Sequence, residues 1–499
     1  MLCIALAFLM PGCSSNKNSQ SSAGSGGTLY WWRSKSDASE ATLKQIAQEY
    51  TSQNPGIKIE VVSVDPRNYE NEILSALASY QTVTNAPDIF SINVEDLPRF
   101  APQLVPAADD LFSSTQNTNQ KTSKMSTEYV SDAYESVVTK SCILKDSAGN
   151  SKVYGLPMGL DTLALYINSD AIQKSVQSLR DKNRADNALS QEQLTAITKA
   201  MQAPPKTWTE LTKIVPYLTI RDGNTITQSA IAMGTSANVE RSADLLQTMM
   251  LQNGTQMTSA DENSAAFNLS TAEAGSSQSS SIPGLRALEF YLQFSSPSSA
   301  LYTWNEKMPN SVTAFEQGQV AMIAHYSDLY RFLISEMPTL KSSIDVQPLP
   351  QVTDPSSPLA SEKVKSMAKM NVEVASSAKG DAKRQLAAWK FIQYVTSKQG
   401  SATYLSAMKL TSPLKDNNGQ PKFQAFATQK TWADLWYKGI KSQDVDQNFI
   451  SMIENAAAKK KSNKDALDQA AKDTSAILAG SNVKWPNANI QTNAQATSQ

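Results

Sequence analysis

The chain has 499 residues, more than one hydrophobic core usually supports, and this length predicts two domains or lobes. Its 45 basic and 46 acidic residues leave a formal net charge of −1 without a long basic stripe, which argues against a nucleic-acid partner. The single histidine, His325, excludes a multi-histidine zinc site, and we expect it to be packed or hydrogen-bonded. The glycine motifs of ATP and dinucleotide binding are missing as well. We therefore expect no cofactor, no metal and no catalytic residue.

The N-terminal segment is an apolar run over residues 1–10 that ends in Pro-Gly-Cys. A run this short cannot span a bilayer, which requires about 20 residues, and is instead typical of a secretory signal peptide. Gly12 followed by Cys13 is similar to the lipobox of bacterial lipoproteins, which implies that Cys13 is acylated and becomes the mature N-terminus. The alternative is a buried N-terminal strand with a free cysteine. We interpret residues 1–12 as a signal peptide and residues 13–27, rich in Ser, Asn and Gly, as the lipidated cysteine and a flexible linker.

The next segment alternates the periodicities of strands and helices. Strand patterns cover residues 28–32, 57–61 and 87–92, and helix patterns cover residues 43–50 and 73–80. This order predicts a parallel sheet with right-handed crossovers. Ligands bind beyond the carboxyl ends of the strands in such sheets. Trp32 and Arg33, after the first strand, and Glu95, after the third, are therefore expected beside a crevice.

The remainder of the chain continues the α/β pattern with longer helices. We expect helices at residues 192–202, 208–218, 239–251, 314–319, 381–398 and 447–478. Residues 259–281 and 352–369 are poor in apolar side chains and predict exposed loops, and residues 486–499 form a polar tail.

Four separated patches carry a family resemblance. They are residues 55–60 with 86–89, residues 153–157 (VYGLP) with 161–168, residues 204–211 (PPKTWTEL), and residues 314–322 with 388–392. In this order the patches resemble the family 1 extracellular solute-binding proteins of ABC importers, a group that includes the maltose- and other sugar-binding proteins.

The resemblance implies an α/β fold of the two-lobed type II periplasmic-binding-protein class, with a ligand cleft between the lobes. Lobe one would comprise residues 28–160 and 367–415, and lobe two residues 161–366 and 416–485. The chain would cross between them near residues 159–161, 371–373 and 411–413.

The resemblance also assigns candidate ligand contacts. Glu95 and Asp161 occupy positions where relatives use acidic residues, and Trp32 ends the first strand next to the cleft; a surface or hinge role is the alternative for each. Relatives typically stack a Gly-x-Trp indole on sugar, whereas this chain offers Tyr326 for stacking and Asp328 for a more polar site. Trp304 and Trp436 are further candidates, with core packing as the alternative, and Trp208 is expected to pack.

The implied function is a lipid-anchored, monomeric binding protein on the extracellular face of the cell membrane. It would capture a sugar or oligosaccharide and deliver it to an ABC permease without performing chemistry. A binder of the same fold for a polyol phosphate, peptide or polyamine would show the same two-lobed pattern. Two further functions compete with solute binding: a surface glycosidase with paired carboxylates, and a purely structural lipoprotein.

Overall fold

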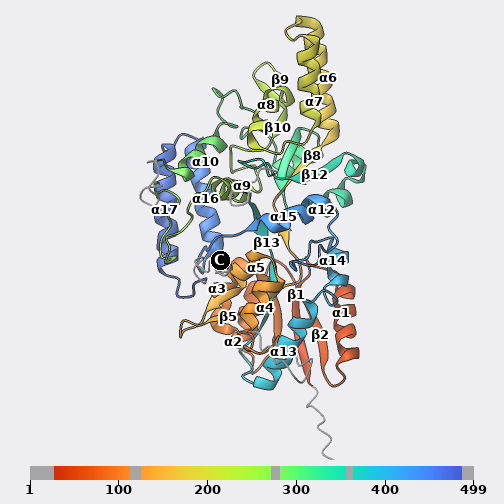
Figure 1. Ribbon diagram of the computed structural model, residues 1–499, viewed down its shortest axis with the longest axis vertical. Helices are drawn as coiled ribbons and strands as arrows, with labels where there is room; N and C mark the ends of the chain where they lie inside the picture. Colours follow the sequence, from red (N-terminus) through yellow and green to blue (C-terminus); the bar gives the residue numbers. More distant parts are fainter. Residues whose placement is uncertain (1–26, 113–124, 271–280, 356–363, 486–499) are drawn as a thin grey trace, which may run out of the picture.

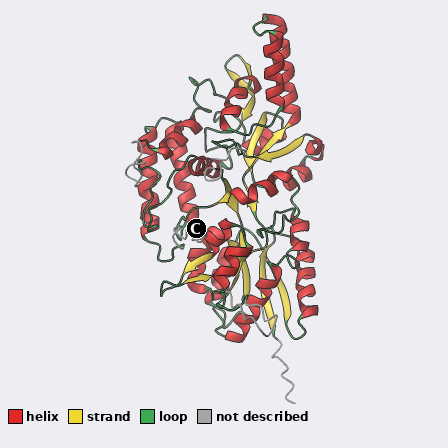
Figure 2. Cartoon of the chain, in the orientation of Figure 1, coloured by secondary structure: helices red, strands yellow, loops and turns green. Residues whose placement is uncertain are grey.

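The computed structural model describes residues 27–112, 125–270, 281–355 and 364–485. They form two α/β lobes stacked along the long axis of the molecule, with a small sheet between them (Figure 1). Helices flank the sheet of each lobe (Figure 2). The predicted signal peptide, Cys13, most of the linker and the polar tail lie outside the described residues.

Lobe one, in the lower half of Figure 1, is built on a five-stranded sheet in the order β2-β1-β3-β14-β6. Its elements are β1 (Thr28–Ser34), α1 (Glu40–Gln53), β2 (Lys58–Val64), α2 (Tyr69–Ala78), β3 (Ile89–Asn93), β6 (Leu156–Pro157) and β14 (Asn371–Ala375). The first three strands are parallel, which confirms the crossover pattern expected from the sequence. Helix α1 begins where the Ser39 side chain accepts from the Thr42 amide, and it buries Leu43, Ile46 and Tyr50 against the sheet.

The remaining elements of lobe one cover this sheet. They are the short helices η1 (Val94–Asp96), α3 (Leu97–Phe100) and η2 (Ala101–Gln103), helices α4 (Ser126–Ala133), α5 (Ser136–Cys142), α13 (Ala382–Val395) and α14 (Ala402–Met408), and the hairpin β4 (Ile143–Lys145) with β5 (Ser151–Val153).

Lobe two is built on a second five-stranded sheet in the order β12-β8-β11-β10-β9. Its strands are β8 (Ala164–Asn168), β9 (Ile220–Asp222), β10 (Thr225–Ile231), β11 (Val320–His325) and β12 (Ile344–Pro348). Its helices are α6 (Ser169–Asp186), α7 (Gln191–Gln202), α8 (Trp208–Leu218), α9 (Ser242–Gln252), α10 (Pro283–Leu292), α11 (Ser311–Glu316), α12 (Asp328–Glu336), η3 (Pro338–Ser342) and α15 (Gln424–Gln429). Helices α6 and α7 project from the body of the lobe (Figure 1). Helix α6 is an addition to the sequence prediction, because most of its side chains are polar and exposed.

Two C-terminal helices pack beside α9 and α10: α16 (Ser442–Ala457) and α17 (Asn463–Ala479). The prediction of one helix over residues 447–478 is therefore wrong at its centre. Lys459 adopts a left-handed backbone conformation with φ of 55°, which ends the helical path. Ser462 then caps α17 by accepting from the Asp465 amide.

A three-stranded sheet joins the lobes in the order β15-β13-β7. It contains β7 (Asp161–Thr162), β13 (Ser366–Lys369) and β15 (Ala433–Asp434), the last preceded by η4 (Lys430–Trp432). The prediction of an exposed loop over residues 352–369 is wrong at its end, where residues 366–369 form β13. In this strand Lys369 lies directly opposite Asp161 of β7. The crossing segments thus bring an ammonium group and a carboxylate together between the lobes. Among the helices of the described ranges, none is both long and apolar enough to cross a membrane.

Candidate functional site

A cavity of about 300 Å³ opens where the two lobes meet the crossing strands. Its polar lining includes Ser34, Ser36, Asp37, Asn371 and Tyr404 from lobe one, Asp161 and Lys369 from the crossing strands, and Ser327, Asp328 and Arg331 from lobe two. A second cavity of about 220 Å³ shares Ser34, Ser36, Asp37 and Asn371 and extends toward Tyr69 and Asn93. A larger open hollow of about 870 Å³ lies elsewhere, at the turn between α16 and α17, and its lining is dominated by lysines and carboxylates. The cavity between the lobes and the adjoining cavity on the lobe-one side together define the candidate site, which we call the cleft.

On the lobe-one wall, Asp37 is held by groups from distant parts of the chain. Arg33, buried at the end of β1, forms ion pairs with both Asp37 and Glu373. The Tyr404 hydroxyl donates to Asp37 Oδ1 at 2.8 Å, and Trp31 Nε1 donates to Glu373 at 2.7 Å. Asp37 is a cleft residue that the sequence prediction misses, because Tyr404 and Glu373, which hold it and its ion-pair partner, lie far away in the chain.

On the crossing strands, Asp161 faces the first turn of α12. Its Oδ2 accepts from the Ser327 amide at 2.9 Å and from the Ser327 hydroxyl at 2.7 Å, and its Oδ1 accepts from the Thr162 amide at 2.9 Å. Burial, together with the nearby charge of Asp328, raises the pKa of Asp161 to about 6. Asp161 is thus a buried acceptor that lines the cavity and connects the crossing strands to lobe two.

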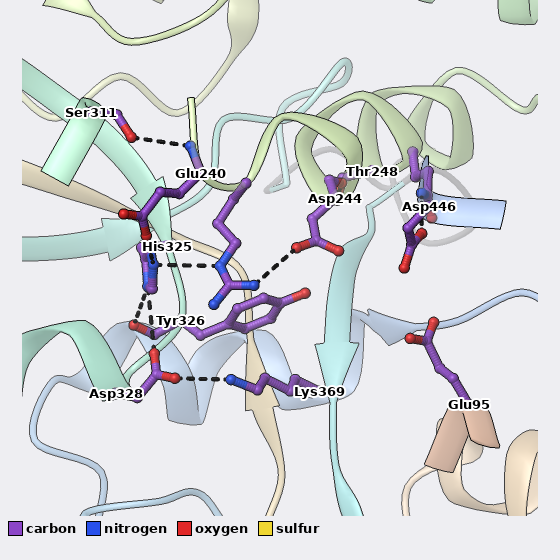
Figure 3. A network of polar contacts seen from close by, with 12 residues as sticks. Glu95, Glu240, Asp244, Thr248, Ser311, His325, Tyr326, Asp328, Lys369 and Asp446 are labelled. Atoms are coloured by element: carbon purple, nitrogen blue, oxygen red, sulfur yellow. Dashed lines mark hydrogen bonds and ion pairs between the residues drawn. The ribbon is translucent and has the colours of Figure 1, made fainter. Parts of the chain in front are cut away.

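Asp328 lies between a histidine and a lysine. Figure 3 shows its carboxylate between His325 and Lys369; Asp328 Oδ2 is 2.8 Å from Lys369 Nζ and Oδ1 is 3.4 Å from His325 Nδ1. Burial alone would raise the pKa of Asp328, but His325 and Lys369 outweigh it and lower that pKa. Asp328 is therefore a charged acceptor on the cavity wall, and its contact with a ligand stays a prediction.

The adjacent Tyr326 ring is buried, and cations lie over it. The Arg241 guanidinium carbon is 5.2 Å from the ring centroid and Lys369 Nζ is 5.1 Å from it. Both distances are within cation–π range. In this structure the Tyr326 ring is thus packed against protein cations, so the expected role of stacking on a sugar requires at least one of them to move.

Glu95 extends from lobe one toward Asp446 of lobe two (Figure 3). Its Oε1 is 2.7 Å from Lys438 Nζ, which is also 2.7 Å from Asp446 Oδ1. Burial raises the pKa of Glu95 to about 7; Lys438 opposes this shift and Asp446 adds to it. Glu95 therefore pairs with the opposite lobe instead of presenting a free carboxylate to a ligand.

The three candidate tryptophans are buried with their indole N–H groups bonded to protein. Trp32 donates to the Asn85 carbonyl at 2.8 Å, Trp304 to Asn238 Oδ1 at 2.9 Å, and Trp436 to Gln247 Oε1 at 2.8 Å. These three do not line either cleft cavity. The structure thus favours core packing over ligand stacking for all of them, since large apolar rings gain most from burial. Trp208 packs as expected, with its indole donating to Gln252 at 2.7 Å.

Comparison with known proteins places the chain in a family. The model of the bacterial extracellular solute-binding protein family matches residues 45–426. A sequence search of curated proteins gives no significant match.

Solved structures share the fold at low sequence identity. The cyclic α-maltosyl-1,6-maltose binding protein of Arthrobacter globiformis is 15% identical over 91% of this chain and 99% of its own, with a TM-score of 0.65. The sugar-binding protein MalE of Xanthomonas citri is 18% identical over 91% and 98%, with a TM-score of 0.62. An ABC transporter solute-binding protein of Thermotoga lettingae, bound to α-D-tagatose, is 17% identical over 90% and 99%, with a TM-score of 0.58. The family match over most of the chain and the shared two-lobed fold lead to one conclusion: this protein belongs to the bacterial extracellular solute-binding protein family.

Proposed function

We propose that the protein captures a sugar or oligosaccharide outside the cell and delivers it to the permease of an ABC importer. The observation that carries this proposal is the polar cleft between the lobes, whose walls present carboxylates, hydroxyls and an amide. Sugar rims consist of hydroxyl groups that need such acceptors and donors. Structural neighbours described as binders of tagatose and maltose-type sugars add support.

The charges of the cleft disfavour an anionic ligand. Asp37 is paired with Arg33, and Lys369 is paired with Asp328. Asp161 accepts only from hydroxyl and amide groups in the contacts described above. An anionic ligand would add negative charge beside these carboxylates, which is unfavourable in a partly buried site. Neutral sugars therefore fit better than polyol phosphates.

We propose that binding is the whole activity and that the protein catalyses no reaction. The cleft carboxylates Asp37 and Asp161 are fixed by neighbouring donors, as expected of hydroxyl acceptors. Incubation with oligosaccharides should yield no cleavage products on chromatography. Appearance of shorter sugars would instead support the glycosidase alternative.

The central test is a thermal-shift screen of residues 28–485 against mono- and oligosaccharides, with peptides, polyamines and polyol phosphates as comparison sets. A ligand that binds only the folded state adds about 2.7 kcal/mol of stability at a hundredfold excess over Kd. We expect a neutral saccharide to give the largest shift. A larger shift from a peptide, polyamine or phosphate would replace the sugar proposal with that ligand class.

We assign residues 28–160 and 367–415 to lobe one and residues 161–366 and 416–485 to lobe two, and we propose that the lobes close over the ligand. A ligand that binds the closed arrangement better shifts the population toward it. Small-angle scattering at saturating ligand should then give a smaller radius of gyration. An unchanged radius would indicate a preformed site.

We also propose that the protein is a monomer anchored to the membrane through acylated Cys13. Stable anchoring requires more than one acyl chain, as in a fully modified lipoprotein. Cys13→Ala should therefore release the protein into the medium or leave it uncleaved, as judged by fractionation and N-terminal sequencing. Wild-type protein that is soluble and starts elsewhere would contradict the anchor.

A further inference from the structure

We propose that His325 is a positioning residue of the cleft, which holds the Asp328 carboxylate in place and makes ligand capture depend on the charge of the imidazole ring. The capture step rests on the proposed function, whereas the effect of His325 on the charges around it can be measured without any ligand.

The position of His325 carries the argument. It is the last residue of β11, its ring is buried, and it is the single histidine of the chain. Its Nδ1 lies 3.4 Å from Asp328 Oδ1 and 3.4 Å from the Tyr326 carbonyl oxygen. Asp328 in turn lines the cavity and pairs with Lys369. The ring therefore contacts a cleft carboxylate without lining the cavity itself.

The second ring nitrogen faces two partners with opposite requirements. Nε2 is 3.4 Å from Glu240 Oε2 and 3.4 Å from Arg241 Nε. The Arg241 Nε–H group is a donor and needs a lone pair on Nε2, which only a ring unprotonated at Nε2 provides. The Glu240 carboxylate is an acceptor and needs a proton on Nε2. Protonation of Nε2 thus decides which of the two partners the ring holds, and the charged ring always carries that proton.

Each state has a consequence in the cleft. The charged ring is an ion-pair partner of Glu240 at Nε2 and of Asp328 at Nδ1, so one Asp328 oxygen faces the imidazolium and the other faces Lys369. The neutral ring in its Nδ1–H tautomer accepts from Arg241 at Nε2, and the attraction between Nδ1 and Asp328 loses its charge component. Arg241 also lies over the Tyr326 ring and is 3.9 Å from Asp244, so its choice of partner bears on both groups.

The surrounding charges determine the direction of titration. Two carboxylates, Glu240 and Asp328, face the ring, against the guanidinium of Arg241; Lys369 and Asp161 act on Asp328 from the crossing strands. Burial lowers the pKa of His325, but hydrogen bonds to Asp328 and Glu240 outweigh it and raise that pKa above its ordinary value. The ring therefore keeps its charge to a higher pH than an ordinary imidazole does, and it loses that charge as the pH rises.

The first experiment follows the imidazole signal of the ligand-free mature protein by NMR across pH 5 to 9. Because the chain has one histidine, the signal needs no assignment by mutation. We expect a pKa above about 6.5 that falls in Asp328→Asn and in Glu240→Gln. The control is Glu336→Gln, an exposed change on the same helix as Asp328, which should leave the pKa unaltered. A pKa that stays unchanged in Asp328→Asn would overturn the proposal.

The second experiment measures capture, with maltose and the saccharide that gives the largest shift in the screen above as probes. Calorimetric affinity of the wild type should fall about three- to tenfold as the pH rises through the pKa of His325, since a charged hydrogen bond becomes a neutral one. His325→Asn keeps a donor for Asp328 and should bind independently of this titration. His325→Leu should bind more weakly than His325→Asn at every pH. Equal affinity and an unchanged pH profile in both variants would show that His325 is only structural.

The two proposals fail differently. If none of the saccharides binds at any pH, the proposed function and the capture step are rejected together. The NMR titration would still decide whether His325 controls the charges around Asp328.

Discussion

Two clusters of charged groups lie between the lobes, and they differ in whether they line the cleft. The cavity cluster consists of Asp161, His325, Asp328 and Lys369, and the side chains of Asp328 and Lys369 are each 39% exposed. The inter-lobe cluster consists of Glu95, Lys438 and Asp446, and the Lys438 side chain is 1% exposed. Both contain carboxylates that the family resemblance or the fold places near a ligand. Only the first places carboxylates on a cavity wall, so position beside the cavity, and not charge, separates the two clusters.

The two clusters also differ in how much their ion pairs contribute to stability. A half-exposed ion pair contributes little to stability because water screens it, whereas removing one partner of a buried pair leaves an uncompensated charge. The Asp328–Lys369 pair of the cavity cluster can therefore exchange partners with a ligand at low cost. The inter-lobe cluster instead connects η1 to the segment before α16, a connection that the Ser442 hydroxyl extends by donating to Asp96 at 2.9 Å.

The largest effect is expected from Lys438→Met, which breaks the inter-lobe cluster. Burial lowers the pKa of Lys438, but Asp446 and Glu95 outweigh it and raise that pKa, so the residue is a firmly charged partner of both carboxylates. Its loss should lower the free energy of unfolding by about 3–5 kcal/mol, measured by urea denaturation. The double variant with Glu95→Gln should recover part of this loss, because one buried carboxylate no longer lacks a partner.

The matched control is Lys441→Met, three residues along the chain, whose side chain is 64% exposed beside Asp444. It should change stability by no more than about 0.5 kcal/mol. If Lys438→Met and Lys441→Met are equally mild, the inter-lobe cluster does not support the fold.

The next effect concerns pH. The pKa of Glu95 is raised from its ordinary range to about 7, so the folded chain binds this proton more tightly than the unfolded chain does. The stability from this group is fully present below about pH 4.5 and is lost as the pH rises toward 7. The side chain introduced by Glu95→Gln stays neutral at every pH. As the pH rises from 4.5 to 8, the free energy of unfolding of this variant should therefore come to exceed that of the wild type by about 1–3 kcal/mol, as measured by urea denaturation at a series of pH values. Parallel stability curves would show that Glu95 keeps an ordinary pKa.

Much of the fold is predictable from local patterns in the sequence. The alternation in residues 57–61 predicts β2, because a half-buried strand needs apolar side chains at every second position. The predictions fail where local pattern and tertiary contact disagree. Helix α6 shows a weak pattern because it projects into solvent, and β13 lies in a segment of loop-like composition that only its pairing with β7 and β15 makes a strand.

The cleft is less predictable because its contacts join residues far apart in the chain. Asp161 follows from a motif, and the structure places it on the cavity wall. Asp37 does not follow from a motif. It is held by Arg33, and Arg33 is itself held by Glu373, which lies 340 residues further along the chain. The sequence predicts Glu95 as a ligand contact because nothing near Glu95 or Lys438 in the sequence indicates that the two residues form an ion pair.

The third effect is expected in the cavity cluster, from Asp161→Asn. The amide keeps an acceptor for Ser327 but loses the negative charge that a sugar hydroxyl would meet. The affinity for the best saccharide of the screen should fall about five- to 150-fold, equivalent to about 1–3 kcal/mol, in calorimetric titration. Because the Asn NH2 group then faces the Thr162 N–H group, the melting temperature should fall, and binding is measured well below it. Asp444→Asn, an exposed carboxylate, is the control and should bind normally. Wild-type affinity in Asp161→Asn would remove Asp161 from the proposed site.

The smallest effect is expected at a contact that belongs to neither cluster. Arg331, on α12 of lobe two, donates from Nη1 to the carbonyl oxygen of Met408 at 2.6 Å, at the end of α14 in lobe one. Helix ends leave carbonyl groups without partners within the helix, and Arg331 satisfies one of them from the opposite lobe. Because Arg331 is only partly buried, Arg331→Met should weaken this contact between the lobes by about 1 kcal/mol. Scattering of the ligand-free protein should then give a larger radius of gyration, whereas Lys398→Met, an exposed change on lobe one, should leave it unaltered. Identical radii for all three proteins would mean that this contact does not hold the lobes together, and the inter-lobe cluster would then be the stronger connection between them.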